Sequence, residues 1–138
     1  TPDGFATAFD RWTQSRFRLA MDGICPSCAA AMPTTLLDDD PDDLASHHRC
    51  QNCKYEARVP LFGHVLFHPA VISFFDDAAI DVTRMPYWEL QQFATDIDES
   101  VISDAPWRAM VSIDAGDRRL ELTLDESLDV IEIDRSAD

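Results

Sequence analysis

Basic side chains are scarce in this 138-residue chain. Lysine and arginine together number 11, with Lys54 the only lysine, against 26 aspartates and glutamates. The net charge of −15 leaves at best a small basic spot at Arg16, Arg18, Arg49 and Lys54, so nucleic-acid binding by this segment finds little support. An acidic surface stays hydrated in concentrated salt, where at about 1 M the Debye length falls to about 3 Å and self-repulsion is screened. The composition therefore indicates a halophilic protein, which low salt should destabilise.

Long apolar runs are missing as well. The longest uncharged run, residues 59–75, is shorter than a membrane span of about 20 residues and is interrupted by Pro60, Gly63 and Pro69. We therefore predict neither a membrane span nor a targeting segment, and we expect a cytoplasmic protein in which this run is buried core. A hydrophobic content of 46% with regular periodicity indicates a folded chain rather than a disordered acidic one.

Motifs that carry catalysis are also absent. The sequence has no glycine-rich phosphate-binding loop, no nucleophile elbow and no H-E-x-x-H metalloprotease helix. We therefore predict that the chain is not an enzyme.

Four side chains remain as candidates for an effector pocket. His64 and His68 stand on either side of an apolar stretch and suit a small ligand site, although a histidine at a helix start is more often a cap. Tyr87 and Trp88 would suit the aromatic wall of such a pocket, and packing in the core is the alternative for both.

The cysteines are few but arranged in a pattern. All four lie in two C-x-x-C pairs, Cys25 with Cys28 and Cys50 with Cys53, separated by 21 residues. Two such turns brought together form a tetrahedron of sulfurs, which predicts one structural zinc ion per chain with no open coordination position. Iron accepts the same four thiolates. Two disulfides or a thioredoxin-like redox motif are the alternatives, and both fit the paired spacing less well.

Polar residues surround the second cysteine pair. Arg49 and Lys54 flank it, and we expect these cations to offset the negative charge of the thiolates. His47 and His48 lie close enough to act as substitute ligands, but with four cysteines present we expect them in a solvated loop. The acidic run 38–43 lacks the spacing and central glycine of a calcium loop, so it is also expected to be solvated.

Hydrophobic periodicity predicts an α+β fold in a single domain spanning residues 1–138. We expect an N-terminal helix over 1–16, with Phe5, Phe9 and Trp12 on one face, and a zinc ribbon over 17–62. In the ribbon, alternation from Phe17 predicts a strand that enters the first cysteine turn, 29–37 forms a returning strand, and 55–61 forms a third.

The second half of the chain is expected to be helical and then β. Residues 63–98 should hold two central helices, one starting at His68-Pro69 and one at Pro86 with an apolar stripe that ends at Ile97. Alternating residues from 107, from 120 and from 130 predict a C-terminal three-stranded antiparallel meander within 99–138.

The arrangement of these motifs resembles the C-terminal domain of haloarchaeal ArsR-like winged-helix transcription regulators. The resemblance rests on the runs 17–19 and 22–28, the pair at 50 and 53, the runs 60–64, 68–71 and 74–75, and the runs 87–90, 105–108 and 124–126. Ala29 departs from the pattern, because a glycine commonly follows such a cysteine turn.

The resemblance implies a role in regulation. Proteins of this kind carry a winged-helix DNA-binding domain followed by a zinc ribbon that senses an effector or dimerises. No winged helix lies in these 138 residues, so DNA contact is expected only through a domain outside this chain, and the chain is expected to be an accessory module and a homodimer. The alternative is a small metalloenzyme or metal-responsive protein in which His64, His68 and Asp76 or Asp77 form a second site.

Overall fold

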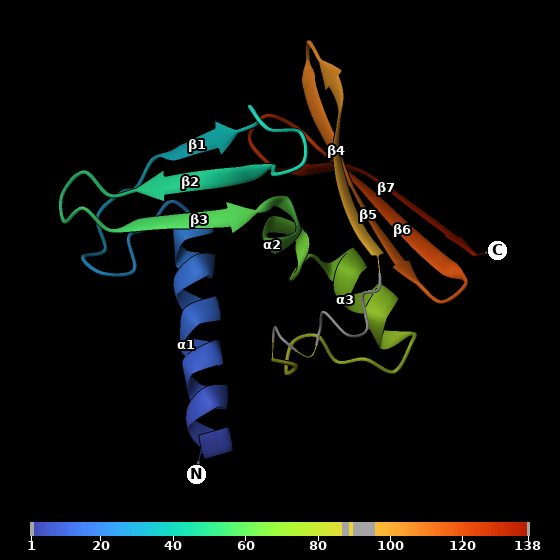
Figure 1. Ribbon diagram of the computed structural model, residues 1–138, viewed down its shortest axis with the longest axis horizontal. Coiled ribbons are helices and arrows are strands. Elements are labelled where there is room, and N and C mark those ends of the chain that lie inside the picture. Colours follow the sequence, from blue (N-terminus) through green and yellow to red (C-terminus); the bar gives the residue numbers. More distant parts are fainter. Residues whose placement is uncertain (1, 87–88, 90–95, 138) are drawn as a thin grey trace.

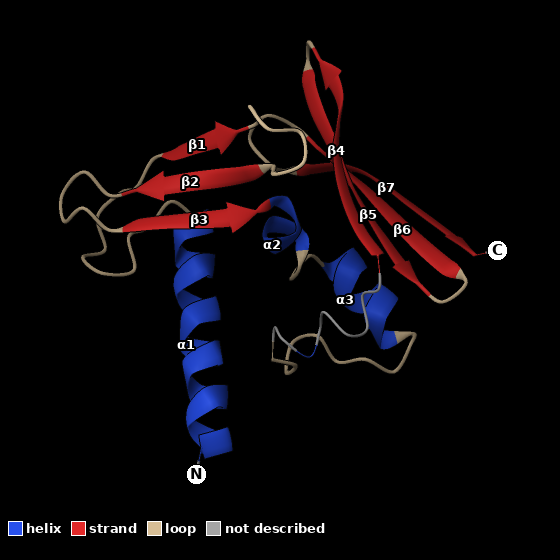
Figure 2. Cartoon of the chain, viewed as in Figure 1, coloured by secondary structure: helices blue, strands red, loops and turns tan. Residues whose placement is uncertain are grey.

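Two antiparallel sheets and three helices make up the computed structural model, which describes residues 2–86, 89 and 96–137. One sheet has three strands in the order β1-β2-β3, and the other has four in the order β4-β5-β6-β7. Figure 2 shows the two sheets apart from each other, with α2 and α3 between them and α1 below the three-stranded sheet. The α+β class predicted from the sequence is confirmed. None of the helices in the described ranges is long and apolar enough to cross a membrane.

Helix α1 (Pro2–Met21) is longer than predicted, and the strand expected from Phe17 is wrong. Phe9, Phe17 and Met21 repeat at helical spacing and face the same cavity, so the helical period continues through the stretch that also alternates. The helix ends at Gly23, whose φ of 79° provides the left-handed conformation that closes many helices. Figure 1 shows α1 running from the N-terminus up to the three-stranded sheet.

The ribbon sheet consists of β1 (Thr34–Leu37), β2 (Ala45–Arg49) and β3 (Glu56–Pro60). The returning strand predicted over 29–37 is shorter than expected, with only an isolated bridge between Ile24 and Ala31 before Thr34. His47 and His48 lie in β2, not in a solvated loop, and His48 is completely buried. That prediction failed because five residues between a polar loop and a cysteine carry too weak a pattern for a strand.

Two short helices follow the ribbon, α2 (Leu61–Val65) and α3 (Pro69–Asp76). The predicted start of α3 is confirmed, since Nδ1 of His68 accepts a hydrogen bond from the backbone N–H of Ala70 at 3.1 Å. The helix predicted from Pro86 falls mostly on residues 87–88 and 90–95, outside those described. Its last expected residue, Ile97, lies in a strand instead.

The C-terminal sheet has one strand more than predicted. Strand β4 (Asp96–Asp104) precedes β5 (Trp107–Ala115), β6 (Arg118–Leu124) and β7 (Val130–Ala137), and each strand pairs antiparallel with the next. We call the cluster that α2 and α3 form with this sheet the large core; it includes Phe74, Phe75, Ile113, Leu120 and Leu122, all at most 1% exposed.

A second cluster, the small core, joins the end of α1 to the ribbon. Its buried members are Ala20, Cys25, Met32, Cys50 and Ala57, with Phe17 and Tyr55 packed against them. The large core therefore joins α2 and α3 to the C-terminal sheet. The small core joins the end of α1 to the ribbon and contains two of the four cysteines.

Candidate metal centre

The two cysteine turns have the same backbone geometry. In the first, the N–H of Ala29 donates to the carbonyl of Cys25 at 2.9 Å; in the second, the N–H of Lys54 donates to the carbonyl of Cys50 at 3.1 Å. Ala29 and Lys54 both have positive φ, at 66° and 71°. The first turn follows α1 and the second connects β2 to β3, so the two halves of the site come from elements 21 residues apart in sequence.

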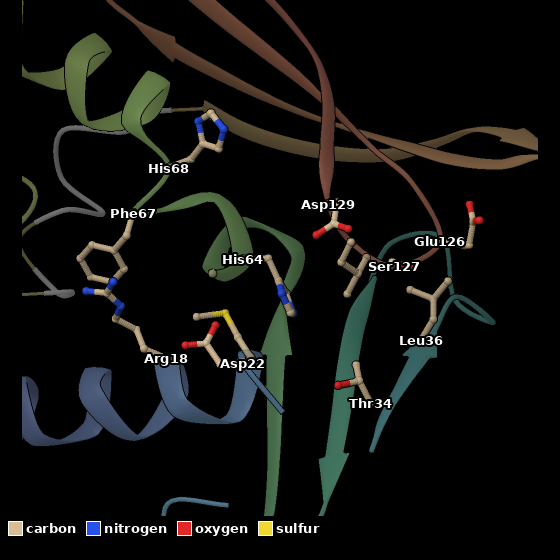
Figure 3. Close-up of a pocket in the computed structure, with 13 residues that line it drawn as sticks. Arg18, Asp22, Thr34, Leu36, His64, Phe67, His68, Glu126, Ser127 and Asp129 are labelled. Atoms are coloured by element: carbon tan, nitrogen blue, oxygen red, sulfur yellow. The ribbon is translucent and has the colours of Figure 1, made fainter. Parts of the chain in front are cut away.

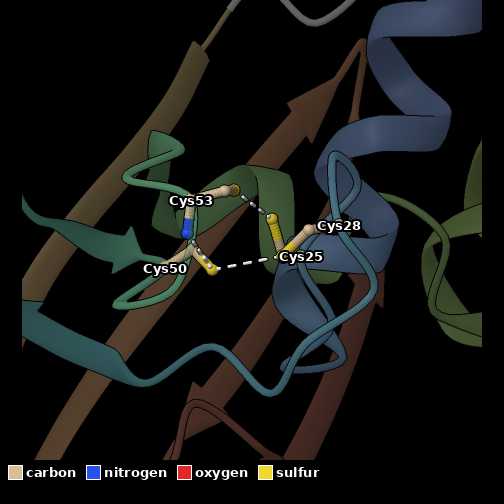
Figure 4. A group of neighbouring side chains, drawn as sticks. All are labelled: Cys25, Cys28, Cys50 and Cys53. Atoms are coloured by element: carbon tan, nitrogen blue, oxygen red, sulfur yellow. Dashed lines mark hydrogen bonds between the residues drawn. The ribbon is translucent and has the colours of Figure 1, made fainter.

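The four sulfurs converge on one point, as Figure 4 shows. Cys25 Sγ lies 3.5 Å from Cys53 Sγ, Cys28 Sγ lies 3.6 Å from Cys50 Sγ, and all four lie within 4.8 Å of one another. A disulfide would need about 2.05 Å, and all four cysteines are free. Zinc–sulfur bonds of about 2.3 Å in a tetrahedron place the sulfurs about 3.8 Å apart. The thiol cluster therefore fits a tetrahedral metal ion.

Hydrogen bonds from both turns point at the sulfurs. The N–H of Ser27 donates to Cys25 Sγ at 3.4 Å, and the N–H of Cys53 donates to Cys50 Sγ at 3.5 Å. The side-chain amide of Asn52 donates to Cys28 Sγ at 3.5 Å, and this bond is the main reason that the pKa of the Cys28 thiol is lowered to about 6. Such bonds stabilise thiolates, the form in which cysteine binds metal.

The sulfurs cannot all ionise without a cation. The backbone N–H of Tyr55 favours the thiolate of Cys53, but the three neighbouring sulfurs and burial raise the pKa of this thiol to about 12. A divalent metal ion removes that obstacle, because it binds the thiolates and releases their protons. Nε of Arg49, which flanks the second turn, lies 3.7 Å from a carboxylate oxygen of Glu56.

The burial of the four cysteines differs, and together they could enclose a metal ion. Cys25 and Cys50 are buried in the small core, while Cys28 and Cys53 are exposed. When all four bind one ion, no position remains for water or substrate, as a catalytic metal would require. The ion would join the end of α1 to the β2–β3 turn.

Residues 1–130 match the model of a protein family described as "Domain of unknown function (DUF7351)". The chain belongs to this family. No curated protein and no solved structure matches it. Since the match covers both cysteine turns and most of both sheets, the four converging cysteines lie inside the DUF7351 domain.

The remaining predicted site residues are partly brought together. In this DUF7351 domain His64 and His68 line one cavity of about 570 Å³, shown in Figure 3, although the ring of His68 is also engaged as the cap of α3. Tyr87 and Trp88 lie outside the described residues. Asp77 pairs with Arg135, and Asp76 is exposed. Within the part of the chain that the structure describes, the four cysteines are the only group of three or more potential metal ligands that converge.

A hydrogen-bonded row beside this cavity, with Ser46 and His48 buried at its centre, was not predicted from the sequence. Ser46 Oγ lies 2.7 Å from Nε2 of His48 and 2.5 Å from Nε2 of His64, and Nδ1 of His48 lies 3.1 Å from the hydroxyl of Thr34. Burial lowers the pKa of His64 to about 4 and also lowers that of His48, so both rings are neutral near pH 7. No spacing in the sequence connects Thr34, Ser46 and His64, because the pairing of β1 with β2 and the packing of α2 bring them together.

The positive φ at Ala29 and Lys54 leads to a prediction about the cysteine turns. An alanine in the left-handed conformation destabilises the folded chain by about 1–2 kcal/mol. Glycine removes this strain, but part of the gain is offset because glycine increases the conformational entropy of the unfolded chain. Ala29→Gly and Lys54→Gly should each raise the free energy of unfolding of the metal-loaded chain by up to about 1 kcal/mol, measured by urea titration. The control is Ala30→Gly in the same turn, where φ is not positive and glycine should destabilise. Equal destabilisation by Ala29→Gly and Ala30→Gly would contradict the argument.

Proposed function

We propose that this chain is the accessory domain of a haloarchaeal ArsR-like transcription regulator, in which a structural zinc ion holds a module for effector sensing or dimerisation. The single observation that carries the proposal is the closed four-sulfur cluster, which fixes a scaffold and leaves no coordination position for catalysis. Zinc is proposed over iron because nothing near the sulfurs indicates electron transfer. A winged-helix domain outside this chain would contact DNA in the cytoplasm.

The position of the cavity supports a sensing role. Its wall is formed by Arg18 and Asp22 at the end of α1, by Thr34 of β1, by His64, and by the turn between β6 and β7. A ligand there would touch the ribbon, the helices and the C-terminal sheet at once. Binding in such a place can change how these parts sit together, which is what a sensor domain must transmit.

An exposed aromatic row on α1 supports dimerisation. Phe5 is 74% exposed, Phe9 56% and Trp12 54%, and neighbouring ring centroids lie 6.4 Å and 5.9 Å apart. A contiguous apolar surface of this kind is typical of interaction sites. The same face on a second copy would cover it through a two-fold axis.

We expect Phe5→Ser to convert a dimer to a monomer without unfolding it, because this ring is largely exposed and lines neither the metal centre nor the cavity. Light scattering coupled to size exclusion in concentrated KCl measures the mass. Ile133→Ser, another exposed apolar residue but on β7, is the matched control and should leave the mass unchanged. A wild-type monomer, or a dimer unaffected by Phe5→Ser, would rule out dimerisation through α1.

The regulator role needs its own test. In a protein that joins this domain to a winged-helix domain, deleting residues 2–137 should weaken operator binding and abolish dimerisation, measured by gel shift and light scattering. Operator binding and a molecular mass that both stay unchanged after the deletion would contradict the proposal. Metal analysis addresses the alternative of a second metal site: one zinc per chain, unaffected by His64→Ala and His68→Ala, is expected.

A further inference from the structure

Two cavities of opposite character meet beside α1. The cavity lined by His64 has a volume of about 570 Å³, and a second one of about 420 Å³ lies between α1 and the segment from β3 to α2. Both volumes fall in the range of small-molecule sites. Met21, Gly63 and Phe67 line both cavities, so the two share a wall.

The second cavity is apolar. Its lining includes Phe9, Phe17, Val59, Leu66 and Phe67, with polar groups at Asp10, Thr13 and Gln14 on α1. The carboxylate of Asp10 accepts a hydrogen bond from the Gln14 amide at 2.7 Å, so these polar groups are engaged with each other. The remaining surface suits an aliphatic or aromatic group.

The first cavity contains a cation without a carboxylate partner. Arg18 is exposed at the cavity wall, its guanidinium lies 4.7 Å from the centroid of the Phe67 ring, and among the described residues no carboxylate lies within ion-pair distance of it. By contrast, Arg58, Arg108 and Arg119 all form ion pairs at 3.2 Å or less. An unpaired guanidinium above the wall that the cavities share is suited to a carboxylate.

The hydrogen-bonded row places a histidine ring in the same cavity. Nε2 of His64 lies 2.5 Å from Oγ of Ser46, and its other ring nitrogen, Nδ1, has no partner in the described part of the chain. In the tautomer that carries its proton on Nδ1, this N–H donates to a carboxylate in the cavity.

We infer that the two cavities bind one amphiphilic monocarboxylate, with its apolar body between α1 and α2 and its carboxylate on Arg18 and the His64 N–H. The acidic residues Asp22, Glu126 and Asp129 also line the polar cavity, and all three are exposed. Figure 3 shows Arg18 and Phe67 on one side of the cavity and Glu126 on the other. These carboxylates disfavour a dianion such as a phosphate ester more strongly than a ligand with a single negative charge. Such a monocarboxylate would be the effector in the sensing role proposed above, and its assignment as an effector rests on that role.

Calorimetry on the zinc-loaded 138-residue chain in concentrated KCl tests this with three probes of equal chain length: decanoate, decanol and decylamine, each below its micelle concentration. We expect decanoate to bind once per chain and more tightly than decanol, with decylamine weakest. Arg18→Gln should weaken decanoate about tenfold and leave decanol unchanged, since the lost interaction is a charge-assisted hydrogen bond. Arg18→Lys should retain part of the difference.

The matched control is Arg16→Gln, because this arginine stacks on Trp12 and Tyr55 and lines neither cavity. It should leave decanoate binding unchanged, and zinc content verifies that each variant folds. Absence of binding by all three probes, decylamine binding tightest, or equal loss in Arg16→Gln and Arg18→Gln would overturn the inference. If decanoate does not bind while deletion of the domain still weakens operator binding, the proposed ligand class is wrong but the regulator role is supported.

Discussion

Cys28→Ser should leave the ribbon and the end of α1 unfolded. Cys28 is exposed and outside the small core, so its loss removes a metal ligand without opening a cavity. Structural zinc contributes about 10–16 kcal/mol of folding free energy in small peptides, against a net stability of about 5–15 kcal/mol for a whole domain. The small core has five buried members, two of them cysteines, and cannot replace that contribution.

Metal analysis and amide hydrogen exchange measure the effect. The backbone amides of β2 and β3 should lose their protection from exchange. Those of β5 and β6 should keep most of theirs, because the buried residues of these two strands belong to the large core. Ser27→Ala is the matched control: it lies in the same turn, and its contact with Cys25 comes from the backbone N–H, which alanine retains. Full metal loading of Cys28→Ser with an unchanged unfolding midpoint would show that the cluster does not hold the ribbon. Removing metal with a chelator should reproduce the variant.

The convergence of the four cysteines was the most predictable part of the molecule. Two C-x-x-C pairs impose a local geometry that needs no knowledge of the rest of the fold, and the structure brings all four sulfurs within 4.8 Å. The strands of the C-terminal sheet that alternate apolar and polar residues were predictable for the same reason, since one face is buried and the other wet. The start of α3 was also predictable, because His68-Pro69 is a local signal.

The elements that were missed depend on partners distant in sequence. Strand β4 (Asp96–Asp104) is rich in acidic and polar residues and has no clean alternation, so it is a strand mainly because β5 offers it a paired edge. Phe17 to Met21 satisfy both a strand and a helix pattern. This segment is helical because Phe17 and Ala20 lie on the same face of a helix and both pack in the small core.

The hydrogen-bonded row beside the cavity could not be predicted from the sequence either. His48 was expected in water, yet strand register places it opposite Thr34 in β1, and its ring stacks on His64 of α2 at 5.8 Å between centroids. Nothing in a histidine's neighbours along the chain reports such a contact. Polar residues acquire this kind of role only once the strands are paired.

Phe74→Ala should be the most damaging single change in the large core. The ring is completely buried in α3, packs edge-on against Phe75 with centroids 5.7 Å apart, and has the guanidinium groups of Arg118 and Arg135 at 5.6 Å and 5.3 Å. Truncating a buried phenylalanine costs about 3–5 kcal/mol, and each cation–π contact adds about 0.5–1 kcal/mol. The loss is comparable to much of the net stability of a domain.

Urea unfolding in concentrated KCl, followed together with zinc content, separates this effect from that of Cys28→Ser. Phe74→Ala should lower the midpoint without reducing the metal content of the folded chain, because no residue of α3 belongs to the small core. Ile133→Ala, which truncates a side chain that is 46% exposed and lies outside the proposed dimer face, should change the free energy of unfolding by no more than about 0.5 kcal/mol. If Phe74→Ala released zinc as readily as Cys28→Ser, the two cores would be one cooperative unit. The metal would then stabilise the C-terminal sheet as well as the ribbon.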